Sequence, residues 1–342
     1  MKAIVKYDEK AGCVGIREMP EPEPGPFDVK VQIKATGLCY SDMSIIQNKY
    51  VGRKPVPIPL ILGHEGAGVV VKTGEAVRNV AVGDRVGMVP IEGCMVCSDC
   101  LSGNENMCMN WRHLGITYHG TFAEYTVTPA AKAHKIPDEV SFVDAACLEP
   151  IGLSARTFEL VKFQLGDTVA IVGPGSLGIF HLQAFKAAGA AKVIMIGLDQ
   201  DKERFEVAKI IGADIVNGSK EDVVSRVFEL TDGKGVDVAV ETANSPAATR
   251  LAIDVTGNKG RVALFGLYPE ANISPLVITR RGLTVIGDVA QVQRHYLRAM
   301  RWVAQGYVRA EPFISRTYHL DEFEEAFAPD NLGKTFKVIF EI

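Results

Sequence analysis

The sequence predicts a mixed α/β chain with two domains, a β-rich barrel-like domain and a doubly wound parallel sheet. Three observations predict this. The chain has 342 residues, about the length of two ordinary domains. Up to about residue 136, short β-branched runs are separated by glycine and proline turns. From about residue 150, short apolar runs alternate with helical segments of about 10 to 15 residues.

The first part of the chain carries four strand-like runs. Each is short, rich in β-branched residues and bounded by turn residues, which is typical of a barrel-like β domain. These runs are residues 28–35, 66–73, 83–89 and 121–129. A proline-rich connector, "MPEPEPGP" at residues 19–26, is expected to be stiff and extended.

The later part alternates strands with helices. Helices are predicted at 176–190, ending at Gly189, and at 201–214, closed by Gly212. The predicted strands are 168–173, 192–197, 237–243, 260–267 and 283–288. This alternation predicts a parallel, doubly wound sheet. The tail begins with a helix, "RHYLRAMRWVAQG", and ends with a strand, "TFKVIFEI", that could return to the first domain.

Composition excludes several classes of protein. With 47% hydrophobic and 23% charged residues, the chain can bury a sizeable core without disulfides. A net charge of −4 argues against a nucleic-acid surface or a basic membrane-seeking face. No apolar run reaches the roughly 18 residues of a membrane span, and "MKAIVKYDEK" lacks the apolar centre of a secretory signal. We therefore expect a cytoplasmic location, where closely spaced cysteines indicate metal binding or catalysis before disulfides.

A glycine pattern lies where the first predicted strand of the sheet meets a helix. Gly173, Gly175 and Gly178 form G-x-G-x-x-G, with Ser176 and Leu177 between the last two. The first glycine allows a tight turn, the second lets a pyrophosphate approach the backbone, and the third lets helix and strand pack closely. In this context the pattern predicts dinucleotide binding; the alternative is a turn with a structural role only.

The residue that selects the cofactor is expected about 20 residues further on. Gly197 stands where the acid is expected, and Asp199 follows in a slightly longer loop. Asp199 could bind a ribose hydroxyl of NAD, whereas Lys202 and Arg204 could accept the 2′-phosphate of NADP. A solvated loop of mixed charge is the third interpretation. We expect NAD, with NADP as the alternative.

Four of the seven cysteines lie within fifteen positions, spaced C-x2-C-x2-C-x7-C. Four thiolates at such spacing can fill a closed tetrahedral Zn(Cys)4 site, which leaves no position for substrate and is therefore structural. Disulfides or an iron–sulfur cluster are the alternatives. The predicted ligands, in a lobe at about residues 93–109, are Cys94, Cys97, Cys100 and Cys108. Cys13 and Cys147 have no partner in sequence and are expected in the core.

A catalytic metal would need other ligands and an open coordination position. "GLCYSD" offers Cys39, "LGHEGAG" offers His64 and Glu65, and "CLEPIG" offers Glu149. A lone cysteine is more often a packed core residue than a ligand. The glycines that flank His64 and Glu65 favour the metal interpretation, because they allow the backbone to crowd a bulky site.

Taken together, these motifs resemble the zinc-dependent medium-chain dehydrogenases/reductases, the alcohol and polyol dehydrogenase family. The matching segments are "GLCYSD", "GHEGAGVV" followed by "VGDRV", the four-cysteine lobe, "GTFAEY", "LEPIG" and "VAIVGPGSLG". They occur in the family's order and span nearly the whole chain. "GHE" and "EP" are more similar to the sorbitol and threonine dehydrogenase branch than to the alcohol dehydrogenases that carry a cysteine at the position of Glu149.

The resemblance implies a GroES-like catalytic domain formed by residues 1–150 and 290–342. A Rossmann domain of residues 151–289 would be inserted between these parts, with the active site in the cleft. It implies a homodimer or homotetramer that pairs through the Rossmann sheets, with the predicted strands at 260–267 and 283–288 at the edge.

The resemblance also implies roles for individual residues. Cys39 and His64 match the catalytic zinc ligands, while Glu65 and Glu149 match two carboxylates that share or exchange the remaining coordination. Ser41 matches the hydroxyl that passes the substrate proton outward. The implied metal content is two zinc ions per chain, one catalytic and one structural.

Four further residues lie next to these motifs. Asp42 matches a carboxylate that orients a metal-bound histidine. Ser44 stands where the family often has the histidine that ends the proton relay, so the relay must end at another group or in water. Tyr118 and His119 are candidate substrate contacts, or else part of an exposed loop.

The implied function is hydride transfer between a secondary alcohol or polyol and NAD(P). An L-threonine 3-dehydrogenase-like activity on amino alcohols is the alternative within the family. A nucleotide-binding scaffold without catalysis is the alternative of another class, against which the complete set of Cys39, His64, Glu65 and Glu149 argues. We expect a small-molecule substrate and neither nucleic acid nor membrane as a partner.

Overall fold

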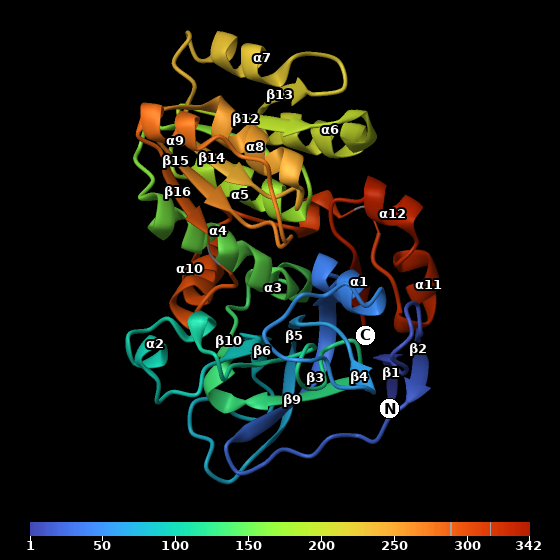
Figure 1. The fold of residues 1–342 in the computed structure, drawn as a ribbon. Coiled ribbons are helices and arrows are strands. Elements are labelled where there is room, and N and C mark those ends of the chain that lie inside the picture. Colours follow the sequence, from blue (N-terminus) through green and yellow to red (C-terminus); the bar gives the residue numbers. More distant parts are fainter. Residues whose placement is uncertain (288, 315) are drawn as a thin grey trace. The chain divides into compact units, whose positions relative to one another are not determined.

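The computed structural model describes residues 1–287, 289–314 and 316–342, which form two compact units (Figure 1). The first unit consists of Met1–Gly152, Ala290–Leu332 and Lys337–Ile342, and the second of Leu153–Val289 and Gly333–Phe336. Most of the C-terminal tail therefore rejoins the N-terminal part of the chain. Among these residues, no helix is both long and apolar enough to cross a membrane.

The first unit is built on antiparallel strands. A three-stranded sheet has the order β2 (Val14–Glu18), β1 (Lys2–Lys6), β4 (Leu60–Ile61). A six-stranded sheet has the order β10 (Ala133–Lys135), β6 (Arg85–Met88), β5 (Glu65–Thr73), β3 (Asp28–Gly37), β17 (Ile339–Glu341), with β9 (Tyr125–Pro129) also paired to β3. A two-stranded ribbon joins β7 (Ile91–Glu92) and β8 (Arg112–His113). The predicted C-terminal strand thus returns to the first unit, where Ile339 pairs with Gly37.

Alternating side chains explain the core of this unit. Val29, Val31 and Ile33 of β3 are fully buried and pack with Val86 and Met88 of β6. Because successive side chains of a strand point to opposite faces, this pattern fixes which face of the sheet is buried. The strands predicted at 28–35, 66–73 and 83–89 are therefore confirmed by β3, β5 and β6.

The strand predicted at 121–129 is confirmed only from Tyr125 onward. The N–H of Thr121 donates to the Gly63 carbonyl (2.9 Å) and that of Phe122 to the Leu62 carbonyl (2.9 Å). The first part of the predicted strand therefore lies against the segment that leads into His64. A run of strand-forming residues does not reveal such a pairing.

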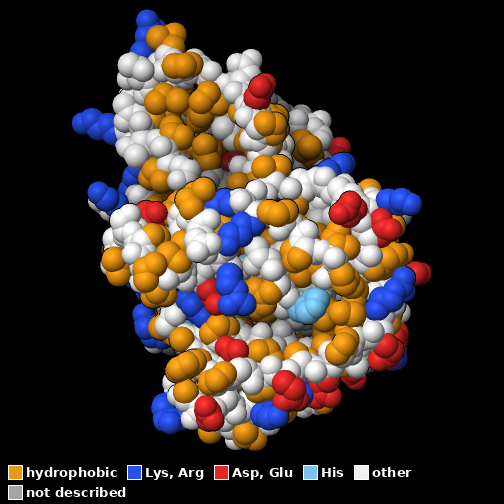
Figure 2. Space-filling view, turned by 60° about the horizontal axis from the view of Figure 1, so that its bottom comes forward, with side chains coloured by type: hydrophobic (Ala, Val, Ile, Leu, Met, Phe, Trp, Pro, Cys, Tyr) orange, Lys and Arg blue, Asp and Glu red, His pale blue; other side chains and the backbone are white. Residues whose placement is uncertain are grey.

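Short helices connect the strands of the first unit and its tail. They are α1 (Tyr40–Ile46), α2 (Ser98–Leu101), η1 (Glu105–Met107), η2 (Ala130–Lys132), α3 (Phe142–Ala146), α10 (Gln293–Ala304), η4 (Glu311–Phe313), η5 (Leu320–Glu322), α11 (Phe323–Ala326) and α12 (Pro329–Lys334). Helix α10 confirms the helix predicted at the start of the tail. On the face drawn in Figure 2, basic and acidic side chains both occur, as the small net charge of the chain leads one to expect.

The second unit is a six-stranded parallel sheet. The strand order is β13 (Asp214–Asn217), β12 (Lys192–Gly197), β11 (Thr168–Val172), β14 (Val236–Glu241), β15 (Thr256–Leu264), β16 (Thr284–Gly287). Its helices are α4 (Leu148–Val161, which starts in the first unit), α5 (Ser176–Ala187), η3 (Asp199–Asp201), α6 (Lys202–Ile211), α7 (Val223–Leu230), α8 (Pro246–Val255) and α9 (Pro275–Arg281). After β13 the chain crosses back to place β14 on the other side of β11, so the switch point of this Rossmann sheet lies between β11 and β14. The predicted α/β fold class is confirmed.

Glycines end two helices of this unit as predicted. Helix α6 stops at Gly212, which has φ 101° in the left-handed region. Helix α5 is followed by Gly189 with φ 87°. Glycine adopts this backbone without the steric cost that a Cβ brings. The predicted strand at 283–288 is confirmed as β16, except that Asp288 lies outside the described residues.

The returning tail is fastened to the first unit by one buried carboxylate. Asp144 in α3 is fully buried, and its Oδ1 accepts hydrogen bonds from the N–H groups of Ala310 (2.6 Å) and Glu311 (2.9 Å). Its Oδ2 accepts a hydrogen bond from Arg309 Nε at 3.0 Å. We predict that Asp144→Ala lowers the free energy of unfolding by about 2–4 kcal/mol, because it removes the acceptor of the Ala310 and Glu311 N–H groups.

Urea unfolding followed by circular dichroism measures this change. The control is Glu311→Ala, which removes only the contact between the exposed Glu311 carboxylate and Arg309 at 3.5 Å. That variant should stay within about 0.5 kcal/mol of the wild type. An Asp144→Ala protein as stable as the control would show that the carboxylate does not hold the tail.

Candidate functional site

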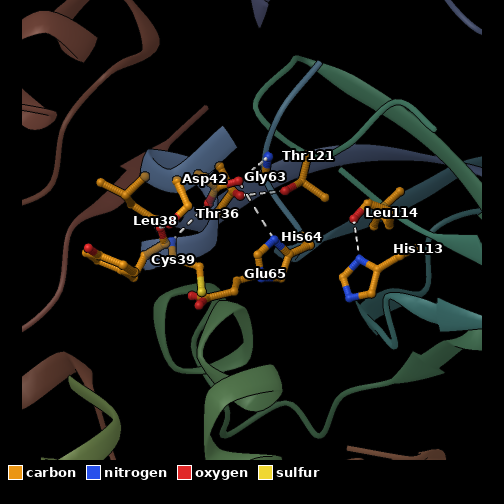
Figure 3. Close-up of polar contacts among 12 residues, drawn as sticks. Thr36, Leu38, Cys39, Asp42, Gly63, His64, Glu65, His113, Leu114 and Thr121 are labelled. Carbon is orange, nitrogen blue, oxygen red and sulfur yellow. Dashed lines mark hydrogen bonds and ion pairs between the residues drawn. The ribbon is translucent and has the colours of Figure 1, made fainter. Parts of the chain in front are cut away.

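Asp42 organises the segment that carries Cys39. Cys39 precedes α1, and its N–H donates to Asp42 Oδ2 at 3.0 Å. The other oxygen, Oδ1, accepts a hydrogen bond from the Gly63 N–H at 3.1 Å and lies 3.8 Å from His64 Nδ1. Figure 3 shows these contacts side by side. The fully buried carboxylate therefore holds the start of α1 against the residues that lead into β5.

Close backbone packing surrounds Gly63. A Cβ at Gly115 or at Gly120 would lie 2.1 Å from the Gly63 carbonyl oxygen, so only glycine fits at either position. Beside this contact, Thr36 Oγ1 and Thr121 Oγ1 form a buried hydrogen bond of 2.7 Å (Figure 3). The glycines near "GHE" therefore allow several backbone segments to meet next to His64.

The structure brings three of the predicted catalytic ligands together. One ligand atom each of Cys39, His64 and Glu65 lies within 4.8 Å of the others. His64 and Glu65 are buried, whereas Cys39 is partly exposed. Glu149, at the start of α4, is buried but is not among the residues of this compact group.

Lys337 is a member of this site that the sequence did not suggest. Its Nζ lies 2.5 Å from Glu65 Oε2 and donates to the Leu38 carbonyl at 2.8 Å, and both charged side chains are almost fully buried. Although burial opposes a charge on the lysine, the carboxylate of Glu65 and the thiols of Cys147 and Cys39 raise its pKa. A lysine inside the otherwise apolar end of "TFKVIF" was the one signal available in the sequence.

The buried acids make this site attractive for positive charge. Burial raises the pKa of Glu149 to about 7, with Glu65 and Asp42 contributing further and His64 opposing. Burial alone would lower the pKa of His64, but the Cys39 thiol, Asp42 and Glu149 raise it to about 10. In the protein without metal, a proton on His64 thus offsets part of the negative charge.

A divalent metal ion would replace that proton, because metal ligation requires a deprotonated imidazole. Sulfur, nitrogen and carboxylate oxygen together are the donors that zinc prefers. The residues present fit a zinc ion on the evidence of their donor types, their approach within 4.8 Å and their buried negative charge.

The four cysteines of the lobe also converge. One sulfur from each lies within 4.8 Å of the others. A tetrahedral zinc site with Zn–S bonds of about 2.3 Å places its sulfurs about 3.8 Å apart, so the cluster fits such an ion. The Cys108 sulfur accepts hydrogen bonds from the N–H groups of Cys94 (3.4 Å) and Asn110 (3.3 Å). Backbone N–H groups of Val96 and Cys97 lower the pKa of Cys94 to about 6, which favours the thiolate.

All seven cysteines are free thiols in the structure. The disulfide interpretation of the lobe therefore has no pair to support it among these residues. Cys147 is fully buried, as predicted, whereas Cys13 is only partly buried.

The glycine pattern forms the turn expected between β11 and α5. Gly173 has φ 113°, and a Cβ there would lie 2.7 Å from the Ala243 nitrogen. A Cβ at Gly178 would lie 2.0 Å from the Gly173 carbonyl oxygen. At Gly175 a Cβ would meet nothing within 4 Å, so this side of the turn is open to a ligand. Ser176 and Leu177 then form the first turn of α5, whose N–H groups suit an anion.

The predicted cofactor-selecting residues follow β12, with Asp199 in η3 and Lys202 and Arg204 in the first turn of α6. The exposed Asp199 Oδ1 accepts a hydrogen bond from Asn217 Nδ2 (2.7 Å) and lies 3.4 Å from Lys220 Nζ. Arg204 is held differently, since its Nη1 contacts Asp201 Oδ1 at 3.3 Å and its Nε donates to the Thr335 carbonyl. Lys202, for its part, lies 3.8 Å from the carboxylate of its neighbour Glu203.

The remaining predicted residues lie in α1 and in the segment between β8 and β9. Ser41 is partly buried in the first turn of α1, and Ser44 Oγ donates to the Tyr40 carbonyl at 3.1 Å.

The Tyr118 hydroxyl donates to Glu92 Oε1 at 2.5 Å. His119 is exposed, and its Nδ1 accepts a hydrogen bond from the Ile61 N–H at 3.2 Å. Tyr118 and His119 line a surface cavity of about 380 Å³, together with residues of the proline-rich connector.

His113 is a second residue that the sequence did not suggest. Its ring meets the ring of His64 edge to face, with 5.2 Å between centroids. Burial, with a contribution from His64, lowers the pKa of His113 to about 3. A neutral imidazole therefore lies beside the candidate zinc ligands.

Two family patterns match the chain. "Alcohol dehydrogenase GroES-like domain" matches residues 25–138, and "Zinc-binding dehydrogenase" matches residues 176–305. The sorbitol dehydrogenase of Halalkalibacterium halodurans is 34% identical over 343 residues, which cover 99% of this chain and 98% of that protein. The L-threonine 3-dehydrogenase of Pyrococcus abyssi is 35% identical over 346 residues, with coverage of 99% and 98%.

A solved structure gives the same result for the fold. A zinc-binding dehydrogenase candidate of Sinorhizobium meliloti 1021, determined with NADP bound, is 32% identical to this chain. The alignment covers 100% of this chain and 99% of that protein, with a TM-score of 0.90. The predicted resemblance is thereby confirmed. The chain belongs to the zinc-dependent medium-chain dehydrogenases, the NAD(P)-dependent oxidoreductases that act on the CH–OH groups of alcohols and polyols.

Proposed function

We propose that the chain oxidises a secondary alcohol or polyol at a zinc ion held by Cys39, His64 and Glu65, with Glu149 as an exchangeable fourth ligand. The observation that carries this proposal is the approach of three ligand atoms within 4.8 Å in surroundings of buried negative charge. A second zinc ion is assigned to the four cysteines of the lobe. That ion would hold the loop together and take no part in the reaction, because four thiolates fill its coordination.

When bound, zinc supplies Lewis acidity that lowers the pKa of the substrate hydroxyl, and NAD(P) supplies the acceptor for the hydride. Asp42 holds His64 and Cys39 in position through its two carboxylate oxygens. Ser41, two residues after Cys39, accepts the hydroxyl proton and passes it toward solvent. Lys337 pairs with Oε2 of Glu65 and leaves the other carboxylate oxygen to the metal.

The relay beyond Ser41 differs from the family pattern with histidine. Ser44 Oγ is bound to the Tyr40 carbonyl, so it is directed into its own helix. We infer that the proton leaves Ser41 through water or the cofactor ribose.

The turn of Gly173, Gly175 and Gly178 would hold the pyrophosphate of the dinucleotide at the start of α5, with Ser176 and Leu177 supplying backbone N–H groups. Asp199 would accept a hydrogen bond from the ribose of NAD. Arg204 is bound to Asp201 and Thr335, which leaves it less suited to a 2′-phosphate and favours NAD over NADP.

We also infer a homodimer or homotetramer in the cytoplasm. Strand β16 lies at the edge of the six-stranded sheet, where one side of its backbone can pair with a second copy. Helix α9, which precedes it, buries none of its residues, and Leu276 on it is 57% exposed. A reducing compartment would keep the seven thiols available for metal binding.

The first test combines zinc analysis with activity. We expect about two zinc ions per wild-type chain and formation of NADH with polyols or secondary alcohols. Cys39→Ser should lose about one zinc ion and nearly all activity while keeping its fold. Cys97→Ser should lose the other ion and much of the stability, because no metal ion then links the cysteines of the loop.

Inductively coupled plasma mass spectrometry, absorbance of NADH at 340 nm and thermal unfolding provide the three measurements. L-threonine in the substrate panel tests the amino-alcohol alternative, which the Pyrococcus relative motivates. About one zinc ion per wild-type chain and no turnover would favour the scaffold. Turnover of Cys39→Ser near the wild-type level would refute the metal assignment.

The second test concerns the cofactor. We expect the wild type to prefer NAD, and Asp199→Ala to reduce the ratio of kcat/KM for NAD to that for NADP by about 10- to 100-fold. That range corresponds to the free energy of one hydrogen bond to a charged group. Glu203→Ala is the control, because Glu203 is also an exposed acid and its carboxylate lies 3.8 Å from Nζ of the neighbouring Lys202. A preference of the wild type for NADP would contradict the role given to Asp199.

The third test concerns the buried pair of Lys337 and Glu65. We expect Lys337→Met to lower the free energy of unfolding by about 3–5 kcal/mol, because it leaves a buried carboxylate without its cation. In the double variant with Glu65→Gln, most of this loss should be recovered. A double-mutant cycle from denaturant unfolding measures the coupling. Strictly additive losses would show that the two charges do not depend on each other.

A further inference from the structure

His113 is a buried imidazole beside the proposed zinc ligands, and no step assigned so far uses it. Its ring lies edge to face with His64, at 5.2 Å and 75°, and with Trp111, at 5.3 Å and 89°. Only 6% of the residue is exposed. Two rings therefore fix the plane of this imidazole next to the place where a substrate would meet the metal.

Hydrogen bonding fixes which nitrogen of His113 carries the proton. Nδ1 lies 2.8 Å from the Leu114 carbonyl oxygen. A carbonyl oxygen only accepts, so Nδ1 donates, and the tautomer with its proton on Nδ1 has a lone pair on Nε2. Figure 3 shows Nδ1 directed at Leu114 and the opposite edge of the ring without a drawn contact.

The backbone holds the residue in this orientation. His113 pairs with Ile91 in the β7–β8 ribbon, and its N–H donates to Thr117 Oγ1 at 2.7 Å. The turn that follows packs against Gly63, because a Cβ at Gly115 would lie 2.1 Å from the Gly63 carbonyl oxygen. The contact that places His64 thus also places His113, so the two rings keep a fixed separation.

The lone pair on Nε2 is available to a ligand. Among the described residues, no hydrogen bond to His113 Nε2 is formed, and this atom is not one of the fully buried atoms without a partner. Part of the surface of this atom is therefore accessible, on a ring that lies 5.2 Å from the ring of His64. An acceptor at this place binds a group that carries O–H or N–H and gains nothing from a C–H group.

We propose that His113 Nε2 accepts a hydrogen bond from a second hydroxyl of the substrate, so that the site selects diols and polyols over simple secondary alcohols. This inference rests on the proposed function, because it takes the reacting hydroxyl to lie at Cys39, His64 and Glu65. A carboxylate would be disfavoured, since two acceptors would face each other. An ammonium group could also donate, and the test therefore includes it.

Three substrates with one carbon skeleton separate these cases: butan-2-ol, butane-2,3-diol and 3-aminobutan-2-ol. They differ only in the second group, which is a hydrogen, a hydroxyl or an ammonium. We expect the zinc-loaded wild type to show its highest kcat/KM with the diol. In His113→Phe, which keeps a planar ring without an acceptor, the ratio of kcat/KM for diol to that for butan-2-ol should fall by about 2- to 12-fold, the worth of one neutral hydrogen bond.

The conservative variant His113→Gln should restore part of the preference for the diol, because its amide oxygen can accept a hydrogen bond from the same hydroxyl. Its ratio should lie closer to the wild type than that of His113→Phe. A change in packing alone would affect the diol and butan-2-ol alike in either variant, and so would not move the ratio.

A spectroscopic readout does not depend on turnover. In protein labelled with ¹⁵N-histidine, the Nε2 resonance of His113, assigned by its absence in His113→Gln, should shift when the diol is added to the complex with NADH. Butan-2-ol should leave that resonance in place. The expected tautomer, with the proton on Nδ1, is read from the same spectrum.

An unchanged ratio in His113→Phe, or a diol that leaves the Nε2 resonance unmoved, would overturn the role of His113. A preference for 3-aminobutan-2-ol that disappears in His113→Phe would overturn the hydroxyl as the recognised group. Absence of NADH formation with every alcohol would instead contradict the proposed function, and the resonance shift would still decide whether His113 binds the diol.

Discussion

Three buried carboxylates, those of Asp42, Glu65 and Glu149, lie around His64, and their burial is the constraint on which the first unit depends. A buried carboxylate is costly unless it is hydrogen-bonded or paired. Backbone N–H groups satisfy Asp42, and Lys337 pairs with Glu65. Glu149 has a raised pKa instead. The protein therefore concentrates negative charge where a divalent ion would relieve it, and much of the local backbone serves to keep that charge in place.

The partners that satisfy this charge come from distant parts of the chain. Lys337 donates to the carbonyl of Leu38, 299 positions earlier. It can do so because β17 adds to β3, so that the last strand completes the sheet next to the first site. Asp144 secures the same tail further upstream. The return of the tail is thus part of the site, since without it Glu65 would be buried beside other acids with no counter-charge from Lys337.

This distribution explains which features the sequence could predict. Local patterns were sufficient for β3, for α5 and for the turn at Gly173, because alternation, helical period and glycine spacing act over a few residues. Lys337 and His113 could not be predicted, since each owes its place to contacts with residues more than 45 positions away. The late start of β9 has the same origin, because Thr121 pairs with Gly63 rather than continuing the strand.

The two candidate metal sites illustrate the same difference in chemical terms. The four cysteines from Cys94 to Cys108 come from one loop, so their spacing in the sequence was enough to predict a metal site. Four thiolates leave no position for a substrate. Cys39, His64 and Glu65 depend on the fold to meet, and only Cys39 among them is partly exposed. Three such donors would leave the fourth position of a tetrahedral ion to an exchangeable ligand, which the closed cysteine cluster cannot offer.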